Sequence, residues 1–335
     1  MAEVTLSGLT KAYGATQALK DVSMTIPDGA FVVLLGPTGA GKTTTLRLIA
    51  GLDRPDSGDV RIDGASVIND TPAQRDIAMV FQQYSLYPHL TVRDNLAFPL
   101  RSPIIAMPED QITKRVQEVA EVLRIPHKLD NKATALSGGE MQRVSIGRAL
   151  VRNPRIYLMD EPLSSLDAKL RADLRIELKR IHADMKATFL YVTHDQIEAM
   201  TMATHVGVLD QGKLVQFGTP REIYESPVSA YVASRLGQPR INLLPADAFG
   251  PAPAGAAQIG LRPEHIHQGP TDSEGGQPAT VRRVEHLGDQ TRLHLSLGPH
   301  EIITLSDAHT PLRPGDSLSI RPHNPLWFDA SGNRL

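Results

Sequence analysis

Short apolar runs alternate with amphipathic segments along the first two-thirds of the chain. Continuous apolar stretches occupy residues 31–35, 156–159 and 189–192, and each ends at a glycine or a polar residue. Runs of this length predict strands that are buried on both faces, as in a parallel sheet. Helical spacing appears in residues 43–50 and in residues 167–185, where leucines line one face and charges the other. This alternation predicts an α/β domain.

A helical subdomain is expected within this first domain, in about residues 90–150. Its apolar positions recur at the spacing of one helix face, at Ile112, Val116, Val119, Ala120 and Leu123. Such a subdomain can carry one edge of a site and move it as a unit. The first domain is expected to span residues 1–235.

The pattern changes near residue 236. Residues 245–260 are rich in proline, alanine and glycine and predict a connecting segment. Beyond them, apolar and polar positions alternate at residues 293–297 and 318–320, which predicts short antiparallel strands. We therefore expect a second, all-β domain over residues 236–335, built as a small β-barrel.

A glycine-rich loop follows the first predicted strand and matches the pattern G-x-x-x-x-G-K-[ST]. In that pattern, glycines let backbone N–H groups curve around phosphate oxygens, while a lysine and a hydroxyl complete the site. The helix that follows adds the positive end of its dipole. A plain glycine turn is the alternative. The candidate phosphate-binding residues are Gly36, Pro37, Thr38, Gly39, Ala40, Gly41, Lys42, Thr43 and Thr44.

Two adjacent carboxylates, Asp160 and Glu161, follow the strand at residues 156–159. Ligands of open α/β sheets lie beyond the carboxyl ends of the strands, so both acids are expected to face the phosphate loop. Mg²⁺ prefers few carboxylates together with hydroxyls, waters and substrate phosphates. We therefore expect Asp160 and Thr43 to hold Mg²⁺ and Glu161 to activate water. The alternative is that the two acids only cap the next helix.

Two further polar side chains follow predicted strands. His194 comes after residues 189–192, where it can reach the same crevice and hydrogen-bond a terminal phosphate, although a lone histidine is more often structural. Gln82 follows the apolar run at residues 77–81, and its amide can contact Mg²⁺ or water. An ordinary polar loop residue is the alternative for Gln82.

A second glycine-rich helix start comes before the acidic pair. Ser137 and Glu140 have the spacing of a capping box. The intervening Gly138 and Gly139 leave the first N–H groups uncovered, and such a helix start can also accept a phosphate. A nucleotide held by Lys42 already has its own loop and helix, so this second start is expected to serve the nucleotide of another copy. A head-to-tail homodimer follows.

Composition narrows the class of protein. With 35 basic and 37 acidic residues the chain has no strong global field, so neither nucleic acid nor an anionic membrane surface is expected as a direct target. The longest apolar runs are about five or six residues, below the ~20 that span a bilayer. The absence of cysteine excludes disulfides and suits a reducing cytoplasm. A chain of 335 residues is expected to form two domains.

The motifs in this order resemble the ATP-binding subunit of an ABC transporter. The resemblance extends to the segment around Tyr13 and to residues 136–144 and 164–167. Residues 81–90 and 260–265 narrow it, because they are similar to the maltose-importer ATPase group. The resemblance implies a P-loop NTPase domain of the ABC type with a helical subdomain. An all-β, oligonucleotide-fold-like (TOBE-type) domain then follows.

The resemblance also implies roles for single residues. Tyr13 would stack on adenine, Gln82 would sense both Mg²⁺ and a permease, and Asp167 would bridge two subunits. Glu161 would be the general base, with Lys42, His194 and Gln82 as the other catalytic groups. Residues Ser137, Gly138 and Gly139 would contact the ATP of the other copy. Two positions depart from the family, since Glu140 and Ser165 stand where glutamine and asparagine are usual.

The implied function is ATP hydrolysis that energises the import of a sugar, a polyol or a sugar derivative such as glycerol phosphate. The implied partners are a second copy, two membrane permeases, an extracytoplasmic solute-binding protein acting indirectly, and a regulatory protein on the C-terminal domain. The implied location is peripheral, on the cytoplasmic face of the inner (plasma) membrane. Two alternatives stay open: a non-transport ABC protein that does mechanical work, and a different P-loop enzyme such as a small-molecule kinase.

Overall fold

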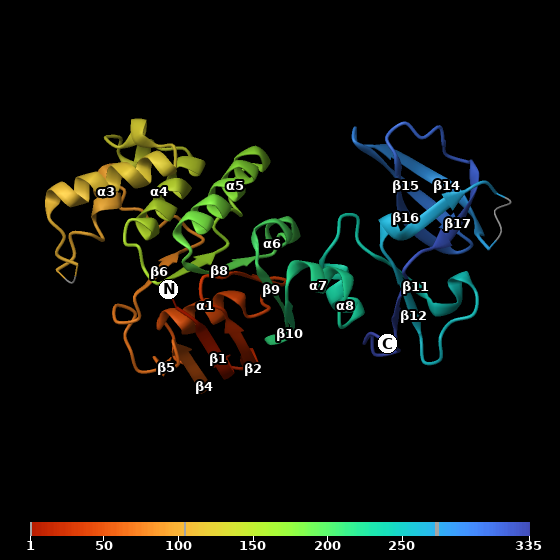
Figure 1. The fold of residues 1–335 in the computed structure, drawn as a ribbon, viewed down its shortest axis with the longest axis horizontal. Helices are drawn as coiled ribbons and strands as arrows, with labels where there is room; N and C mark the ends of the chain where they lie inside the picture. Colours follow the sequence, from red (N-terminus) through yellow and green to blue (C-terminus); the bar gives the residue numbers. More distant parts are fainter. Residues whose placement is uncertain (1, 104, 272–274) are drawn as a thin grey trace. The chain divides into compact units, whose positions relative to one another are not determined.

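The chain forms two compact units, Met1–Pro220 and Arg221–Leu335, each with its own hydrophobic core (Figure 1). The structure is a computed structural model, and it describes residues 2–103, 105–271 and 275–335. The division falls earlier than residue 236. Helix α8 (Ala230–Arg235) therefore lies with the second unit, because its alanines pack in a small cluster with Ile241 and Phe328.

A six-stranded sheet runs through the first unit in the order β10-β9-β3-β8-β7-β6. All neighbours pair in parallel except β10, which is antiparallel to β9. The three strands predicted from continuous apolar runs are confirmed, and every residue in them is buried. The strands are β3 (Phe31–Leu35), β6 (Ile77–Val80), β7 (Ile156–Asp160), β8 (Thr188–Thr193), β9 (His205–Asp210) and β10 (Lys213–Gly218).

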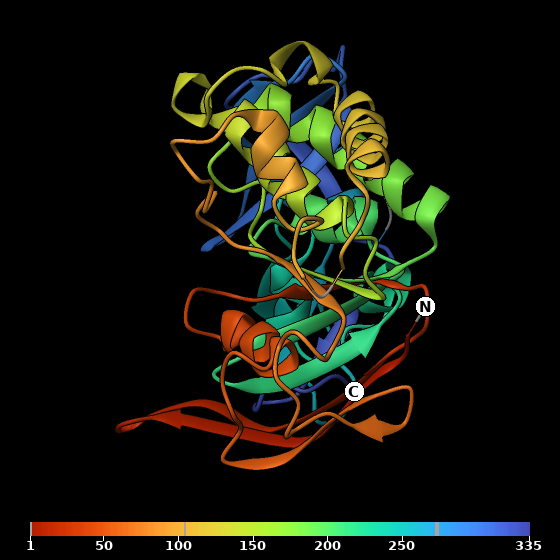
Figure 2. The same ribbon diagram turned by 90° about the vertical axis from the view of Figure 1, so that its left-hand side faces the viewer.

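A second, four-stranded antiparallel sheet has the order β2-β1-β4-β5 and was not expected from the sequence. Helix α1 (Lys42–Ala50) contacts β7 and β8 on one side and β2 on the other, so the core of this unit lies between two sheets (Figure 2). The strands are β1 (Val4–Tyr13), β2 (Thr16–Ile26), β4 (Ser57–Ile62) and β5 (Ala65–Ser66).

Helices cover the other face of the six-stranded sheet, opposite α1 (Figure 1). The predicted helical face is confirmed in α3, where Ile112, Val116, Val119 and Ala120 are buried. The predicted capping box is present at the start of α4. The helices are α2 (Val92–Ala97), α3 (Glu109–Val122), α4 (Gly138–Leu150), α5 (Ala168–Met185) and α6 (Gln196–Met202).

The division falls within α7 (Pro220–Glu225), and after α8 the second unit consists mainly of β-structure. A five-stranded sheet, β13-β17-β14-β15-β16, accompanies a three-stranded sheet, β11-β12-β18. The Gln268 side chain of β13 donates to the Leu305 carbonyl of β16 at 2.7 Å, which joins the two edges of the larger sheet in a barrel-like way. The strands are β11 (Asn242–Pro245), β12 (Gln258–Leu261), β13 (Ile266–Gly269), β14 (Gln277–His286), β15 (Gln290–Leu297), β16 (His300–Asp307), β17 (Ser317–Pro322) and β18 (Leu326–Phe328).

The alternation predicted for this unit is confirmed, because Leu293, Leu295 and Leu297 of β15 point into one core with Leu318 and Ile320 of β17. The connecting segment predicted at residues 245–260 is partly wrong. A 3₁₀ turn, Ala246–Phe249, and the start of β12 occupy much of it. Among the described residues, no helix has the length and apolar character needed to cross a membrane.

Candidate nucleotide-binding site

The carboxyl ends of four neighbouring parallel strands bring the candidate residues to one edge of the sheet. Leu35 of β3 pairs with Thr193 of β8, so the glycine loop and His194 leave the sheet side by side. Asp160 of β7 pairs with Val192 of β8, which sets the acidic pair beside the same histidine. Ligand sites of open α/β sheets form at such an edge.

The glycine loop is shaped by close backbone approaches. Gly41 precedes α1 with φ 101°, in the left-handed region that favours glycine. A Cβ on Gly41 would lie 2.6 Å from Leu19 Cδ2 and 2.7 Å from the Ala18 carbonyl oxygen. A Cβ on Gly36 would lie 2.6 Å from the Leu209 carbonyl oxygen. Strands β2 and β9 therefore press on this loop, and only glycine fits both positions.

The Lys42 ammonium is buried and lies over the loop that precedes it. Its Nζ donates to the carbonyl oxygens of Gly36 at 2.9 Å and Pro37 at 3.0 Å. It also lies 3.5 Å from Glu161 Oε1. A buried ammonium needs such partners, and it is placed to exchange them for phosphate oxygens at the same loop.

Asp160 is a buried carboxylate with one neutral partner. The Thr43 hydroxyl donates to Asp160 Oδ1 at 2.9 Å. Burial raises the pKa of Asp160, and the hydrogen bond from Thr43 only partly opposes that effect. The ionised carboxylate is therefore costly in this place unless a cation compensates it.

Glu161 and His194 are in direct contact. His194 Nδ1 lies 3.1 Å from Glu161 Oε2, and the imidazole is 58% exposed, so its other side faces outward. Glu161 itself has φ 43°, in the left-handed region, and its N–H donates to the Val192 carbonyl at 3.0 Å. Non-glycine residues seldom adopt this backbone conformation, and the cases that occur cluster at functional sites, where the surrounding structure maintains the strain.

Two other expected residues lie near this centre. Gln82 follows β6, whose Val80 pairs with Met159 of β7, so Gln82 is exposed at the same edge of the sheet. Tyr13 is 46% exposed, and its hydroxyl donates to Asp53 Oδ2 at 2.6 Å. Burial and this carboxylate raise the pKa of Tyr13. The ring keeps accessible surface.

The start of α4 is arranged around Glu140. The Ser137 N–H and hydroxyl donate to Glu140 Oε2 at 2.8 and 2.9 Å, and Lys128 Nζ lies 3.0 Å from Glu140 Oε1. The backbone hydrogen bond from Ser137 is the largest of the effects that lower the pKa of Glu140. Lys128 was missed by sequence reasoning, because nothing in the spacing connects it with Glu140.

The two glycines of this helix start differ in their surroundings. A Cβ on Gly139 would lie 1.9 Å from Leu170 Cδ2, whereas one on Gly138 would lie 3.1 Å from the Tyr84 hydroxyl. The Leu170 side chain of α5 would have to shift to admit a Cβ at Gly139, a close approach that the sequence did not reveal. Asp167 has a local partner as well, because its Oδ1 accepts from the Leu170 N–H at 2.9 Å and caps α5.

The donor set at the sheet edge suits Mg²⁺. Thr43 and Asp160 offer a hydroxyl and a carboxylate 2.9 Å apart, and the carboxylate is buried with no positive hydrogen-bond partner in the part of the chain that the structure describes. Mg²⁺ binds few protein oxygens and completes its shell with waters and phosphates. The residues therefore fit the ion, and they stand next to the loop that would hold the phosphates.

A glycine loop with the phosphate-binding pattern at a sheet edge, next to a buried aspartate and to a glutamate in contact with a histidine, is typical of a P-loop NTPase. Family comparison gives the particular class. Residues 19–164 match the ABC transporter family, and residues 259–326 match the TOBE domain. The chain belongs to the family of ATP-binding proteins of ABC transporters, and it is an ATPase.

Relatives align along nearly the whole chain. An sn-glycerol-3-phosphate import ATP-binding protein of Ruegeria sp. (strain TM1040) is 43% identical, over 100% of this chain and 99% of its own. A lactose transport ATP-binding protein of Rhizobium radiobacter is 42% identical, over 100% of both chains. Among solved structures, the dimeric bacterial cassette MJ0796 is 33% identical with a TM-score of 0.60, over 65% of this chain and 99% of that one. The predicted fold class and the resemblance to carbohydrate-importer ATPases are confirmed.

Proposed function

We propose that this protein hydrolyses MgATP to energise the import of a sugar, a polyol or a glycerol phosphate through a pair of membrane permeases. The observation that carries the proposal is the contact of Lys42, Glu161 and His194 at the edge where Thr43 meets Asp160. Relatives of matching length are named for the import of glycerol phosphate and for lactose transport, which supports the direction of transport and the class of solute.

Each residue of the centre has a distinct task in this proposal. Glu161 accepts the proton of the attacking water, and its carboxylate is held from two sides by Lys42 and His194. Lys42 and His194 balance negative charge that grows on the terminal phosphate. Mg²⁺ held by Thr43 and Asp160 would neutralise charge on the phosphate oxygens. Gln82, exposed at the same edge, couples structural changes at this centre to the loop that follows it.

A second copy completes the site. The loop from Gly36 to Thr43 holds the nucleotide from one side, while Ser137, Gly138 and Gly139 of the other copy contact it from the opposite side. Asp167, at the start of α5, lies on the segment that crosses between the copies. Tyr13 stacks on the adenine. The dimeric state of the MJ0796 cassette supports such a pairing for a chain of this family.

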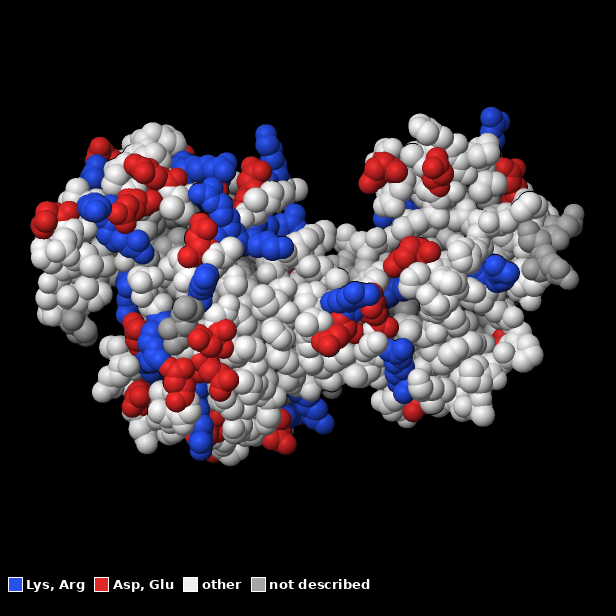
Figure 3. All heavy atoms as spheres, viewed as in Figure 1, with Lys and Arg blue, Asp and Glu red and all other residues white. Residues whose placement is uncertain are grey.

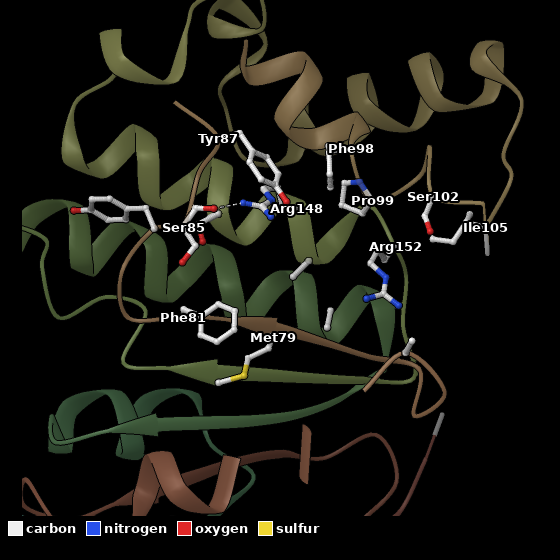
Figure 4. Close-up of a pocket in the computed structure, with 15 residues that line it drawn as sticks. Met79, Phe81, Ser85, Tyr87, Phe98, Pro99, Ser102, Ile105, Arg148 and Arg152 are labelled. Atoms are coloured by element: carbon white, nitrogen blue, oxygen red, sulfur yellow. Dashed lines mark hydrogen bonds between the residues drawn. The ribbon is translucent and has the colours of Figure 1, made fainter. Parts of the chain in front are cut away.

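A cavity of about 360 Å³ beside the loop after Gln82 is the proposed docking site for a cytoplasmic helix of a permease (Figure 4). Its wall is largely apolar and aromatic, and Phe81 and Phe98 are 40% and 49% exposed. The Arg148 guanidinium lies 4.8 Å from the Tyr87 ring and donates to the Ser85 carbonyl. A helix with an apolar face and an acidic residue fits this lining.

The location and the other partners follow from this assignment. The chain would lie on the cytoplasmic face of the inner membrane, held there by the permeases, with an extracytoplasmic solute-binding protein acting from the other side. The second unit is available to a regulatory protein. Basic and acidic side chains are interspersed over the helices of the first unit (Figure 3), a distribution that does not favour a nucleic acid partner.

The experiment is reconstitution of the full chain in proteoliposomes with a candidate permease pair and a candidate solute-binding protein. Uptake of labelled glycerol phosphate or a disaccharide and ATP hydrolysis are expected to rise together when solute is present. Glu161→Gln is expected to keep ATP binding while hydrolysis falls by about 10²- to 10⁴-fold.

Two outcomes would replace the proposal. Phosphate transferred to the sugar rather than to water would favour a P-loop kinase. Hydrolysis that is indifferent to the permeases and the solute would favour an ABC protein that works outside transport.

A further inference from the structure

Arg171 of α5 lies between the two segments that carry Glu161 and His194. Its Nη2 donates to the Leu166 carbonyl at 2.8 Å, and its Nη1 lies 3.7 Å from Asp195 Oδ2. The first contact is with the loop that follows Glu161, and the second is with the residue that follows His194. One guanidinium thus connects both sides of the catalytic contact.

The side that follows His194 is a tightly bonded turn. Asp195 caps α6 by accepting the Ile197 N–H at 2.7 Å, and its own N–H donates to the Thr193 hydroxyl at 3.0 Å. Glu198, in the first turn of α6, is 2% exposed and accepts from the Tyr191 hydroxyl at 2.9 Å. Two carboxylates therefore lie in this turn, and a nearby cation offsets their repulsion.

The charge of Arg171 acts on both carboxylates. It pairs with Asp195, and it works against the burial that raises the pKa of Glu198. Arg171 Nε is buried without a hydrogen-bond partner among the described residues. The contacts of the two Nη atoms therefore hold the guanidinium in place, although leaving this Nε buried and unpaired costs some free energy.

The side that follows Glu161 is equally constrained. The Ser164 hydroxyl donates to the Glu161 carbonyl at 2.9 Å, and the loop continues to Leu166, which Arg171 holds. Helix α5 also packs on α6, so Arg171 lies between the 164–167 loop and the turn beside His194. The loop is the segment proposed to cross to the second copy.

We propose that Arg171 is a positioning residue that keeps His194 aligned with Glu161 when the 164–167 loop meets a second copy. The inference rests on the proposed catalytic roles of these two residues. It adds a route by which contact between the copies adjusts the histidine. Arg171 itself contacts neither nucleotide nor water in this scheme.

The test uses the purified full chain, with kcat, the KM for ATP and the melting temperature measured for each variant. Arg171→Met and Asp195→Asn are expected to lower kcat by about ten- to a hundredfold at unchanged KM and melting temperature. Asparagine still caps α6, so Asp195→Asn removes only the charge. Arg171→Lys is expected to recover part of the rate, because an ammonium still faces Asp195.

The matched control is Arg180→Met on the same helix, whose side chain is 67% exposed and pairs only with Asp184 among the described carboxylates. It is expected to leave kcat unchanged. The double variant Arg171→Met, Asp195→Asn is expected to be no slower than the slower single variant. If Arg171→Met does not fold, the inference is tested with Arg171→Lys and Asp195→Asn.

A wild-type kcat in Asp195→Asn, additive losses in the double variant, or a fall that follows the melting temperature would overturn the inference. These results come from the chain alone. They are therefore distinct from failure of the proposed function, which would appear as hydrolysis without transport.

Discussion

At the residue scale, the sequence predicted which side chains meet but not how they are held. A lysine, two acids and a histidine at strand ends pointed to one edge because parallel strands share their carboxyl edge. The left-handed backbone of Glu161 and the two carbonyls that hold Lys42 depend on neighbouring chain segments, and no local pattern encodes them. The pairing of Lys128 with Glu140 is also set by the tertiary fold and not by any local pattern.

The Lys128–Glu140 pair yields a prediction at this scale. Glu140 is ionised at neutral pH, and the hydrogen bond from the Ser137 N–H lowers its pKa further. It lies at the helix start proposed to meet a triphosphate. Lys128→Met leaves that charge uncompensated, so the KM for ATP is expected to rise by about two- to fivefold, the effect of a partly exposed ion pair. ATP titration of the hydrolysis rate measures it.

The control is the double variant Lys128→Met, Glu140→Gln, which also removes the negative charge of Glu140. A glutamine keeps the capping box, removes the repulsion, and is expected to return the KM of Lys128→Met to its original value. Lys114→Met, at an exposed position of α3, should have no effect. Independent effects of Lys128→Met and Glu140→Gln would mean that the pair does not face the nucleotide.

At the scale of elements, the sequence predicted the strands formed by continuous apolar runs. It did not predict the strands in which the alternation of apolar and polar residues is interrupted. The buried strands β3, β7 and β8 carry polar residues only at their ends, where β7 has Asp160 and β8 has Thr188 and Thr193, so a run of apolar residues identified each. The sheet formed by β1, β2, β4 and β5 was missed, because register shifts interrupt its alternation between Leu6 and Ala12. In β2, Val22, Met24 and Ile26 are buried at every second position, which is the signal that could have revealed it.

The contact of α4 with α5 gives a prediction for an element. A Cβ on Gly139 would lie 1.9 Å from Leu170 Cδ2, so Gly139→Ala is expected to displace the Leu170 side chain and lower the free energy of unfolding by about 1 kcal/mol. Thermal or urea unfolding of the full chain measures this change. Adding Leu170→Ala removes the clashing atom and should recover part of the loss.

Gly138→Ala is the matched comparison, one residue away in the same turn. Its Cβ would lie 3.1 Å from the Tyr84 hydroxyl, a much smaller overlap than the one at Gly139. It is expected to cost less stability than Gly139→Ala. Equal losses at both positions, unaltered by Leu170→Ala, would show that the backbone freedom of glycine matters here rather than the approach of the helices.

At the scale of the whole molecule, the two-part organisation was predicted and the place of division was not settled by composition. The proline-rich stretch at residues 245–260 indicated a linker, yet β11 and β12 pair with each other around it. Pro245 takes part in that pairing from the end of a short strand, where proline is tolerated. Composition therefore located a surface loop inside the second unit rather than the join between units.

The last prediction concerns the proposed dimer. In that dimer groups from both copies would surround each ATP, so neither copy alone would supply all of them. Lys42→Ala removes the phosphate-loop cation, and Ser137→Arg blocks the helix start that serves the other copy. Each variant alone is expected to be inactive at both sites. Mixed in equal amounts, half of the dimers pair one variant with the other, and each such dimer has one site with an intact loop facing an intact serine.

The mixture is therefore expected to regain about a quarter of the wild-type hydrolysis rate if each composite site works alone, since random pairing leaves one intact site in every second dimer. Phosphate release measured against the mixing ratio should follow the product of the two fractions, with its maximum at equal amounts. A matched mixture of Lys42→Ala with Glu161→Gln places both lesions on the same side of the site, so it leaves no intact centre and should stay inactive. Activity that changes linearly with the mixing ratio would instead mean that each chain hydrolyses ATP by itself.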